Sequence, residues 1–446
     1  MERFKMLLDK RNLLIDKKYK EKISEIIMWY LEKIHNEVEA NLIKQDDYED
    51  FLITISNLLP IIPELKKDKY ICVGYELAKK IKIKIESDNF RNFYSMFTEG
   101  LGYCAYSIYS FNRSTGLLSK FLNDINKLFL DESYKQAVKL IDNYKNNTNT
   151  FDYDIIYGLS GTLNYLFEFE WEETEVDKLK TICKYLVMLA EKSSQDEFIA
   201  PKIYIPYHNS TDDEKKCFLY GHINLSVSHG IAGPLKALAM AKNKGFNVEG
   251  LDNSISIFLN IYDKYEIEID NAITWPPIID LEEYCNNRLK NLDYYLDFYK
   301  WCYGSFSLSK ILLETCSYLD DEEKSLKYNN NCKKIAKQHF NDFYLFTTNI
   351  CHGYASILAM QLLAYKKDND ITLITNLEYS INNILNCFDK KNDFGFRINL
   401  DENFINEIKE YEIKSYNFLE GTTGIVLALS LVFNDDIDFN KLLFFD

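Results

Sequence analysis

The chain has 446 residues and a formal net charge of −16, with 47% hydrophobic and 27% charged residues. This is the composition of an ordinary globular protein, and it excludes long disordered stretches. The acidic balance, without any domain-sized basic region, argues against a nucleic-acid partner, because phosphate binding needs clustered lysine and arginine.

Helix is the default expectation, because only seven prolines occur in the whole chain. Residues 23–43 and 176–192 carry apolar side chains at spacings of three and four with charges between them. This pattern predicts amphipathic helices, each with one buried stripe. Strict period-two alternation is scarce outside residues 198–207, which we expect to be extended, within a short insertion at residues 195–222.

An internal repeat follows from residue 158 onwards. Its unit is a glycine, two further residues, a small residue and then an apolar run. The five copies are Gly158-Leu159-Ser160-Gly161, Gly230-Ile231-Ala232-Gly233, Gly304-Ser305-Phe306-Ser307, Gly353-Tyr354-Ala355-Ser356 and Gly421-Thr422-Thr423-Gly424, and a degenerate copy starts at Gly100. At any one place this pattern is more often a helix-packing feature than a functional one. Five copies together predict a series of helix pairs, with the apolar helix of each pair buried on most sides.

Such a series can close into a ring. We predict an all-α fold, an α/α toroid of about seven helix pairs, as a single domain over residues 1–446. Apolar helices would form its inner layer, and the glycine-bearing helix starts would meet at one end of a central cavity. Residues 1–100 carry no comparable signature, so this part of the prediction rests on length alone.

Three residues beside repeat glycines suit a metal site. They are Cys302, in Trp301-Cys302-Tyr303-Gly304, and the adjacent Cys351 and His352, which precede Gly353. Two thiols and an imidazole are a soft ligand set suited to zinc, and three protein ligands leave a fourth position open, as in catalytic zinc sites. A single buried cysteine is more often a small core hydrophobe. Adjacent Cys351 and His352 converge on one ion only in a loop or at a helix start, since neighbouring residues within a helix point about 100° apart.

Two further residues near repeat glycines suit proton transfer. His229 stands before Gly230 as His352 stands before Gly353, and an imidazole gives or takes a proton near neutral pH. A hydrogen-bonded cap or supporting histidine is the alternative for His229. Asp154, four residues before Gly158, fits a helix N-cap, and it also fits a carboxylate that orients an imidazole. His208 and His222 belong to no motif with an evident chemistry.

The motif set resembles the lanthionine synthetase C family, the lanthipeptide cyclases, from about Asp154 to Gly424. The resemblance rests on the order and joint presence of Tyr153-Asp154 with Gly158-Leu159-Ser160-Gly161, Gly221-His222-Ile223-Asn224-Leu225, Ser228-His229-Gly230-Ile231-Ala232-Gly233-Pro234, Trp301-Cys302-Tyr303-Gly304, Cys351-His352-Gly353 and Phe418-Leu419-Glu420-Gly421. It implies a toroid that holds Zn²⁺ through Cys302, Cys351 and His352 at one end of the cavity. It also implies acid/base roles for His229 and Asp154, and a place close to the metal for Tyr303.

The implied reaction adds a peptide cysteine thiol to dehydroalanine or dehydrobutyrine in the same peptide, which closes a lanthionine or methyllanthionine ring. Zinc stabilises the thiolate form of a bound thiol, so this ligand set fits the chemistry. The resemblance indicates a stand-alone, class I-type cyclase whose substrate is a dehydrated lantibiotic precursor peptide. It further implies a separate dehydratase and a membrane exporter as partners.

The sequence departs from the family pattern at three places outside the proposed zinc ligands. Phe298 stands where the family commonly has an arginine, Phe306-Ser307 replaces a Pro-Gly pair, and Ser356 replaces a glycine. They affect stabilisation of the enolate and the shape of loops rather than zinc binding. Arg288 and Lys300 are candidates to replace the missing cation.

Two alternatives stay open. The missing arginine is compatible with a weakened zinc-toroid protein that binds peptide or thiol ligands without turnover. An α/α-toroid carbohydrate enzyme would need two carboxylates at the cavity and no metal, and the Cys and His set argues against it.

The expected location is cytoplasmic, with peripheral association at a membrane complex left open. Met1–Lys10 lack the apolar core of a signal peptide, and the ten cysteines lack the spacing of a secreted disulfide scaffold. The apolar run at residues 425–433, broken only by Ser430, is about half as long as a membrane span.

Overall fold

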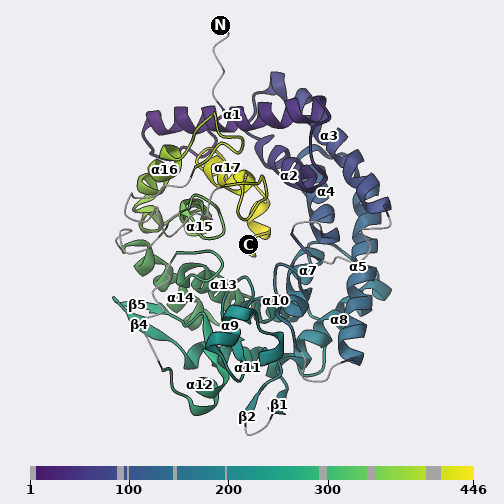
Figure 1. Ribbon diagram of the computed structural model, residues 1–446, viewed down its shortest axis with the longest axis vertical. Coiled ribbons are helices and arrows are strands. Elements are labelled where there is room, and N and C mark those ends of the chain that lie inside the picture. Colours follow the sequence, from purple (N-terminus) through teal and green to yellow (C-terminus); the bar gives the residue numbers. More distant parts are fainter. Residues whose placement is uncertain are drawn as a thin grey trace. The chain divides into compact units, whose positions relative to one another are not determined.

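The computed structural model describes residues 7–87, 95–97, 100–143, 148–195, 198–290, 299–338, 345, 347–397 and 413–446, and most of these residues are helical (Figure 1). The chain divides into two compact units. The first comprises residues 1–93, 103–124 and 336–443, and the second comprises residues 94–102, 125–335 and 444–446. The single domain expected from the sequence stays a prediction.

Seven α-helices of the described residues lie wholly or mostly in the first unit. They are α1 (Lys17–Glu39), α2 (Tyr48–Leu58), α3 (Glu64–Glu86), α4 (Leu101–Thr115), α15 (Tyr354–Asp368), α16 (Leu377–Asn386) and α17 (Thr422–Ser430), with short 3₁₀ turns at Gln45–Asp47, Ile371–Ile374 and Phe439–Lys441. Helix α17 packs against α1, α2 and α15. Figure 1 shows this contact between the purple α1 and the yellow α17, which come from opposite ends of the sequence.

The second unit is centred on α10. Its helices are α6 (Thr150–Tyr153), α7 (Leu159–Leu166), α8 (Glu173–Met188), α9 (Asp212–Cys217), α10 (Ala232–Asn243), α11 (Leu251–Lys264), α12 (Leu281–Asn286), α13 (Ser305–Tyr318) and α14 (Glu322–Ala336), with a 3₁₀ turn at Tyr207–Asn209, and α5 (Ser119–Asp142) enters it from the first unit. Helix α10 packs against α7, α8, α11 and α13. It is buried along nearly its whole length, as its apolar sequence requires.

The predicted repeat is confirmed as a series of helix starts. Gly158, Gly304, Gly353 and Gly421 each stand immediately before a helix, and Gly230 lies two residues before α10. We call α7, α10, α13, α15 and α17 the glycine-led helices. All five are buried over most of their length.

The two predicted amphipathic helices are also confirmed, as α1 and α8. In α8 the buried side chains Leu179, Ile182, Cys183 and Leu186 follow the three-and-four spacing of one helix face. Helix α1 ends at Glu39, shortly before Asn41, whose φ of 53° is outside the helical range.

Three two-stranded antiparallel sheets occur among the described residues, all in the second unit. They pair β1 (Lys192–Gln195) with β2 (Phe198–Pro201), β3 (His222–Asn224) with β6 (Ile278–Asp280), and β4 (Ile267–Ile269) with β5 (Ala272–Thr274). Only β2 falls in the segment that we expected to be extended. The β4–β5 hairpin turns at Asp270 and Asn271, both with positive φ, which suits a tight two-residue hairpin loop.

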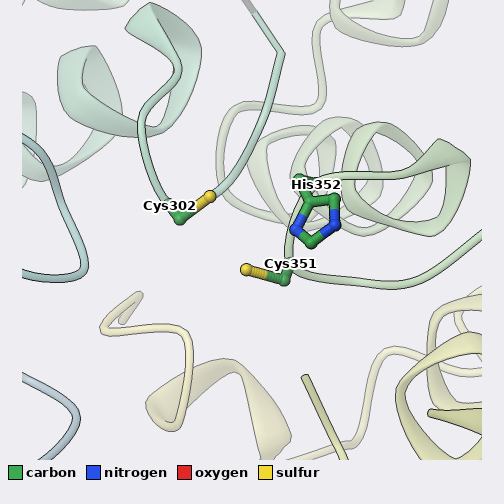
Figure 2. A group of neighbouring side chains, drawn as sticks. All are labelled: Cys302, Cys351 and His352. Atoms are coloured by element: carbon green, nitrogen blue, oxygen red, sulfur yellow. The ribbon is translucent and has the colours of Figure 1, made fainter. Parts of the chain in front are cut away.

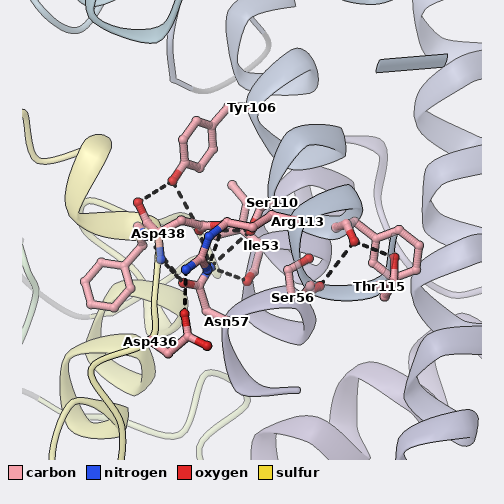
Figure 3. Close-up of polar contacts among 12 residues, drawn as sticks. Ile53, Ser56, Asn57, Tyr106, Ser110, Arg113, Thr115, Asp436 and Asp438 are labelled. Carbon is pink, nitrogen blue, oxygen red and sulfur yellow. Dashed lines mark hydrogen bonds and ion pairs between the residues drawn. The ribbon is translucent and has the colours of Figure 1, made fainter. Parts of the chain in front are cut away.

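A buried polar cluster ties the segment after α17 to α2 and α4 (Figure 3). The carboxylate of Asp438, 2% exposed, accepts hydrogen bonds from Asn57 Nδ2 at 2.8 Å and Ser110 Oγ at 2.9 Å. Asn57 Oδ1 accepts the backbone N–H of Asp438 at 2.8 Å. These bonds satisfy groups that would be costly to bury unpaired, so they fix the register of this segment on the helices.

Among the described residues, the structure contains no helix with both the length and the apolar character needed to cross a membrane.

Candidate functional site

A turn precedes each glycine-led helix and ends at the repeat glycine. In three of these turns the N–H of the glycine donates a hydrogen bond to the carbonyl oxygen of the residue four positions earlier. The donor–acceptor distances are 2.7 Å from Gly304 to Lys300, 3.1 Å from Gly353 to Asn349 and 2.9 Å from Gly421 to Asn417. A Cβ on Gly230 would lie 2.2 Å from the carbonyl oxygen of Ser226. No other residue fits such a close approach, which explains the repeated glycine.

These turns place chemically useful side chains at equivalent positions. The residues immediately before the five glycines are Tyr157, His229, Tyr303, His352 and Glu420, and Cys302 and Cys351 stand one position earlier. Each therefore lies at the amino-terminal end of a buried helix. The sequence repeat thus positions every candidate site residue except Asp154, which begins its turn.

In the second unit, the turn that carries Cys302 is bonded to the turn that carries His229. The backbone N–H groups of Val227 and Ser228 donate to the carbonyl oxygen of Cys302 at 3.0 and 3.2 Å. Cys302 is 7% exposed. These bonds hold the thiol and the imidazole on neighbouring loops of one unit.

Tyr303 lies beside the same two turns. Burial, together with the negative charge of a Cys302 thiolate, raises the pKa of Tyr303 to about 12, although its hydroxyl bonds to the side chains of Asn224 and Ser226. The phenol therefore stays protonated at neutral pH and can donate a hydrogen bond.

His229 and Asp154 form a hydrogen-bonded pair. His229 Nδ1 lies 2.7 Å from Asp154 Oδ2, and Asp154 is fully buried. The other carboxylate oxygen of Asp154 accepts the backbone N–H groups of Ile156, Tyr157 and Gly158 at 2.6–3.1 Å. Asp154 thus holds its own turn with one oxygen and the imidazole with the other, which directs Nε2 of His229 away from the pair.

The pKa of His229 is raised. Burial alone would lower it, but the hydrogen bond and charge of Asp154, with smaller contributions from Cys302 and Glu214, outweigh the burial. His229 is therefore protonated over a wider pH range than an ordinary histidine, which suits a group that donates a proton.

Asp154→Asn is expected to lower the pKa of His229, because the variant removes the charge that raises it. Asparagine keeps an oxygen for the three backbone N–H groups, so the turn should survive, whereas Asp154→Ala should lose it. Because the folded-state pKa is raised, the pair stabilises the fold below the unfolded pKa of about 6.5, and this contribution is lost as the pH rises through the folded pKa.

Histidine NMR titration of wild type and Asp154→Asn measures the change in the pKa of His229. The chain has only six histidines, so the signals can be assigned. Unfolding at acidic and alkaline pH should show that the variant loses more stability at the acidic end. An unchanged His229 pKa, or an equal loss at both ends, would contradict this assignment.

In the first unit, Cys351 and His352 lie on the turn before α15. Asn349 Oδ1 accepts the backbone N–H of His352 at 2.9 Å, and Asn349 Nδ2 lies 3.2 Å from His352 Nε2. The N–H of Cys351 donates to the carbonyl oxygen of Leu419 at 3.0 Å, and Cys351 is half-buried. Figure 2 draws both side chains on this turn, outside any helix, which is the setting that adjacent ligands require.

Sequence reasoning missed three residues at the site of the second unit. Tyr157 stacks on His229, and Asn224 bonds to Tyr303. Glu214, on α9, lies 3.4 Å from His222 Nε2, and its charge contributes to the raised pKa of His229. Tyr157 had a signal in its place before a repeat glycine, and Asn224 had one in the motif at residues 221–225, whereas Glu214 had none.

Of the residues considered for the missing cation, Arg288 is exposed beyond α12, and Lys300 is half-buried in the turn that carries Cys302. Phe298 lies outside the described residues.

The fold and these turns define an α-helical repeat protein that carries cysteine and histidine at its helix starts. The family model for lanthionine synthetase C-like protein matches residues 61–444, and the chain belongs to this family. The resemblance drawn from the motifs is confirmed, and the match begins well before the first motif at Tyr153.

Two known proteins are similar to this chain over most of its length. The nisin biosynthesis protein NisC of Lactococcus lactis subsp. lactis is 24% identical over 424 residues, which cover 90% of each protein. The solved structure titled nisin cyclase matches with a TM-score of 0.74 and 20% identity over 96% of this chain and 98% of that chain. This likeness confirms the predicted fold class, the all-α α/α toroid.

Proposed function

We propose that the chain is a zinc-dependent lanthipeptide cyclase, a stand-alone lanthionine synthetase of the class I type. It would add cysteine thiols of a dehydrated precursor peptide to dehydroalanine or dehydrobutyrine and so form thioether rings. The observation that carries the proposal is the family match over residues 61–444 together with the donor set on the repeat turns, Cys302 in the second unit and Cys351 with His352 on one turn of the first unit.

The donor set fits zinc. Two thiolates and one imidazole are ligands that zinc prefers, and they leave one position for a ligand from outside. Asn349 contacts Nε2 of His352, which leaves Nδ1 as the nitrogen to which we assign the metal. When bound, zinc would lower the pKa of an incoming thiol and hold it as a thiolate.

The surrounding residues would handle the protons. Addition of sulfur to the β-carbon leaves an enolate, whose α-carbon needs a proton. His229, kept in one orientation by Asp154, can supply this proton as an imidazolium or first collect the thiol proton as a neutral base. The protonated hydroxyl of Tyr303 is a candidate hydrogen-bond donor to the enolate oxygen.

The family membership supports the same substrate class, because the curated relative is a nisin biosynthesis protein and the structural relative is titled a cyclase. A dehydratase would have to precede this step, because dehydroalanine and dehydrobutyrine are its products. A membrane exporter as a partner, and a cytoplasmic location with peripheral membrane association, stay predictions from the resemblance and the sequence.

The test is cyclisation of a synthetic peptide that contains one cysteine and one dehydroalanine. Addition leaves the mass unchanged but removes the thiol, so alkylation followed by mass spectrometry measures it. We expect the alkylatable thiol to disappear with zinc-loaded wild type and to persist with His229→Ala. Persistence of the thiol with excess zinc-loaded wild type, in a single-turnover experiment, would instead support the alternative of a peptide- or thiol-binding protein.

A further inference from the structure

Two exposed aromatic side chains continue outward from His229, because Tyr157 contacts the imidazole and Phe151 contacts Tyr157. Tyr157 is 45% exposed and Phe151 is 55% exposed. The rings of Tyr157 and His229 are nearly parallel, at 8°, with centroids 6.4 Å apart, and Phe151 meets Tyr157 edge-on at 5.0 Å. A continuous aromatic surface therefore runs from solvent to the imidazole.

The backbone under both rings is held firmly. The N–H of Tyr157 donates to Asp154 Oδ1 at 2.6 Å, in the turn that also orients His229. Phe151 lies in α6, where Asn149 accepts its N–H at 3.1 Å and forms a capping box with Asp152. Because these positions are already ordered, a ligand that packs on the rings pays little further entropy.

The place of Tyr157 in the repeat points to a ligand. It stands immediately before Gly158, as His229 and Tyr303 stand before Gly230 and Gly304. The exposed ring thus occupies the position that carries a proposed catalytic group, His229 or Tyr303, in two other turns of the second unit. Exposed aromatic surface at such a place loses water when an apolar group covers it, which favours binding.

We propose that Tyr157 and Phe151 form a platform that binds an apolar side chain of the substrate peptide, next to the residue that reacts at His229. This inference rests on the proposed cyclase function and adds a sequence preference to it. Peptides with a large apolar residue beside the dehydrated residue would be preferred over peptides with a polar one. The two aromatic residues would act by positioning the peptide and would take no part in proton transfer.

The test compares two dehydrated peptides that differ only at the residue beside dehydroalanine, leucine in one and asparagine in the other. In wild type we expect KM for the leucine peptide to be about tenfold lower, the effect of one aromatic contact. Tyr157→Ala should remove this difference in KM between the two peptides, Phe151→Ala should weaken it, and Tyr157→Phe should keep it. The matched control is Tyr75→Ala, which removes a tyrosine of similar exposure, 42%, on α3, and should change nothing.

Equal selectivity in wild type and Tyr157→Ala would overturn the platform, provided that zinc content and thermal unfolding show an intact variant. If wild type cyclises neither peptide, the proposed function fails, and calorimetric binding of the same peptides still tests the platform. A leucine preference in binding that Tyr157→Ala abolishes would support it, and no preference would contradict it.

Discussion

Cys351→Ala is expected to lower the rate of cyclisation by about 10³-fold, which corresponds to several kcal/mol of transition-state stabilisation. The variant leaves two of the three proposed zinc ligands, so it should also lose the metal during purification. Thiol alkylation of the model peptide measures the rate, and elemental analysis measures the zinc.

Cys387→Ala is the matched control for this prediction. Cys387 is also in the first unit and is 5% exposed, but it belongs to no group of candidate ligands among the described residues. Its replacement should cost some stability through lost packing and leave zinc and activity in place. Full activity in Cys351→Ala would remove Cys351 from the site.

Glu314→Gln is expected to destabilise the fold by about 3–5 kcal/mol, because it removes the charge partner of buried Lys310 and leaves buried Lys236 with Asp446 alone. Glu314 lies on α13 and is 1% exposed. Its carboxylate forms ion pairs with Lys236 Nζ at 2.7 Å and with Lys310 Nζ at 3.0 Å. Lys236 also reaches Asp446 at 3.0 Å and the carbonyl oxygen of Phe444 at 2.7 Å. The cluster therefore attaches residues 444–446 to α10 and α13.

Denaturant unfolding measures this loss. The comparison is Asp177→Asn, which breaks an exposed pair with Lys180 and should cost less than about 1 kcal/mol. If Glu314→Gln lost no more than Asp177→Asn, water or a neighbouring group would have to replace the charge partner, and the cluster would not have the assigned role.

The sequence predicted the elements whose signals are local. Each repeat glycine marks a helix start because the turn before it admits no Cβ, and this requirement is visible in the sequence. The spacing in residues 176–192 likewise predicted α8, because a buried helix face needs that spacing. The β4–β5 hairpin was missed, since three-residue strands are too short for period-two alternation to stand out.

Contacts between distant segments carried no such signal. Nothing near Lys236 in the sequence indicates that Glu314 and Asp446 lie against it, because the partners are brought together only by packing of α10 on α13. Glu214 likewise carried no signal in the sequence. Its proximity to His222 depends on how α9 folds back towards β3.

Among the candidate site residues, the pairing of His229 with Asp154 is visible in the structure, and its catalytic role stays a proposal. Both residues were found from their places relative to repeat glycines. Tyr157 has an equivalent place but was passed over, because a tyrosine before a helix suggests no chemistry until its ring is seen against an imidazole.

The most direct test of the proposed function is the zinc content of the purified wild-type chain, with X-ray absorption at the zinc edge to identify the ligands. The proposal predicts about one zinc per chain, bound by two sulfur atoms and one imidazole nitrogen, with a fourth ligand from solvent. A correctly folded chain without zinc, or zinc bound with fewer than two sulfur ligands, would contradict it.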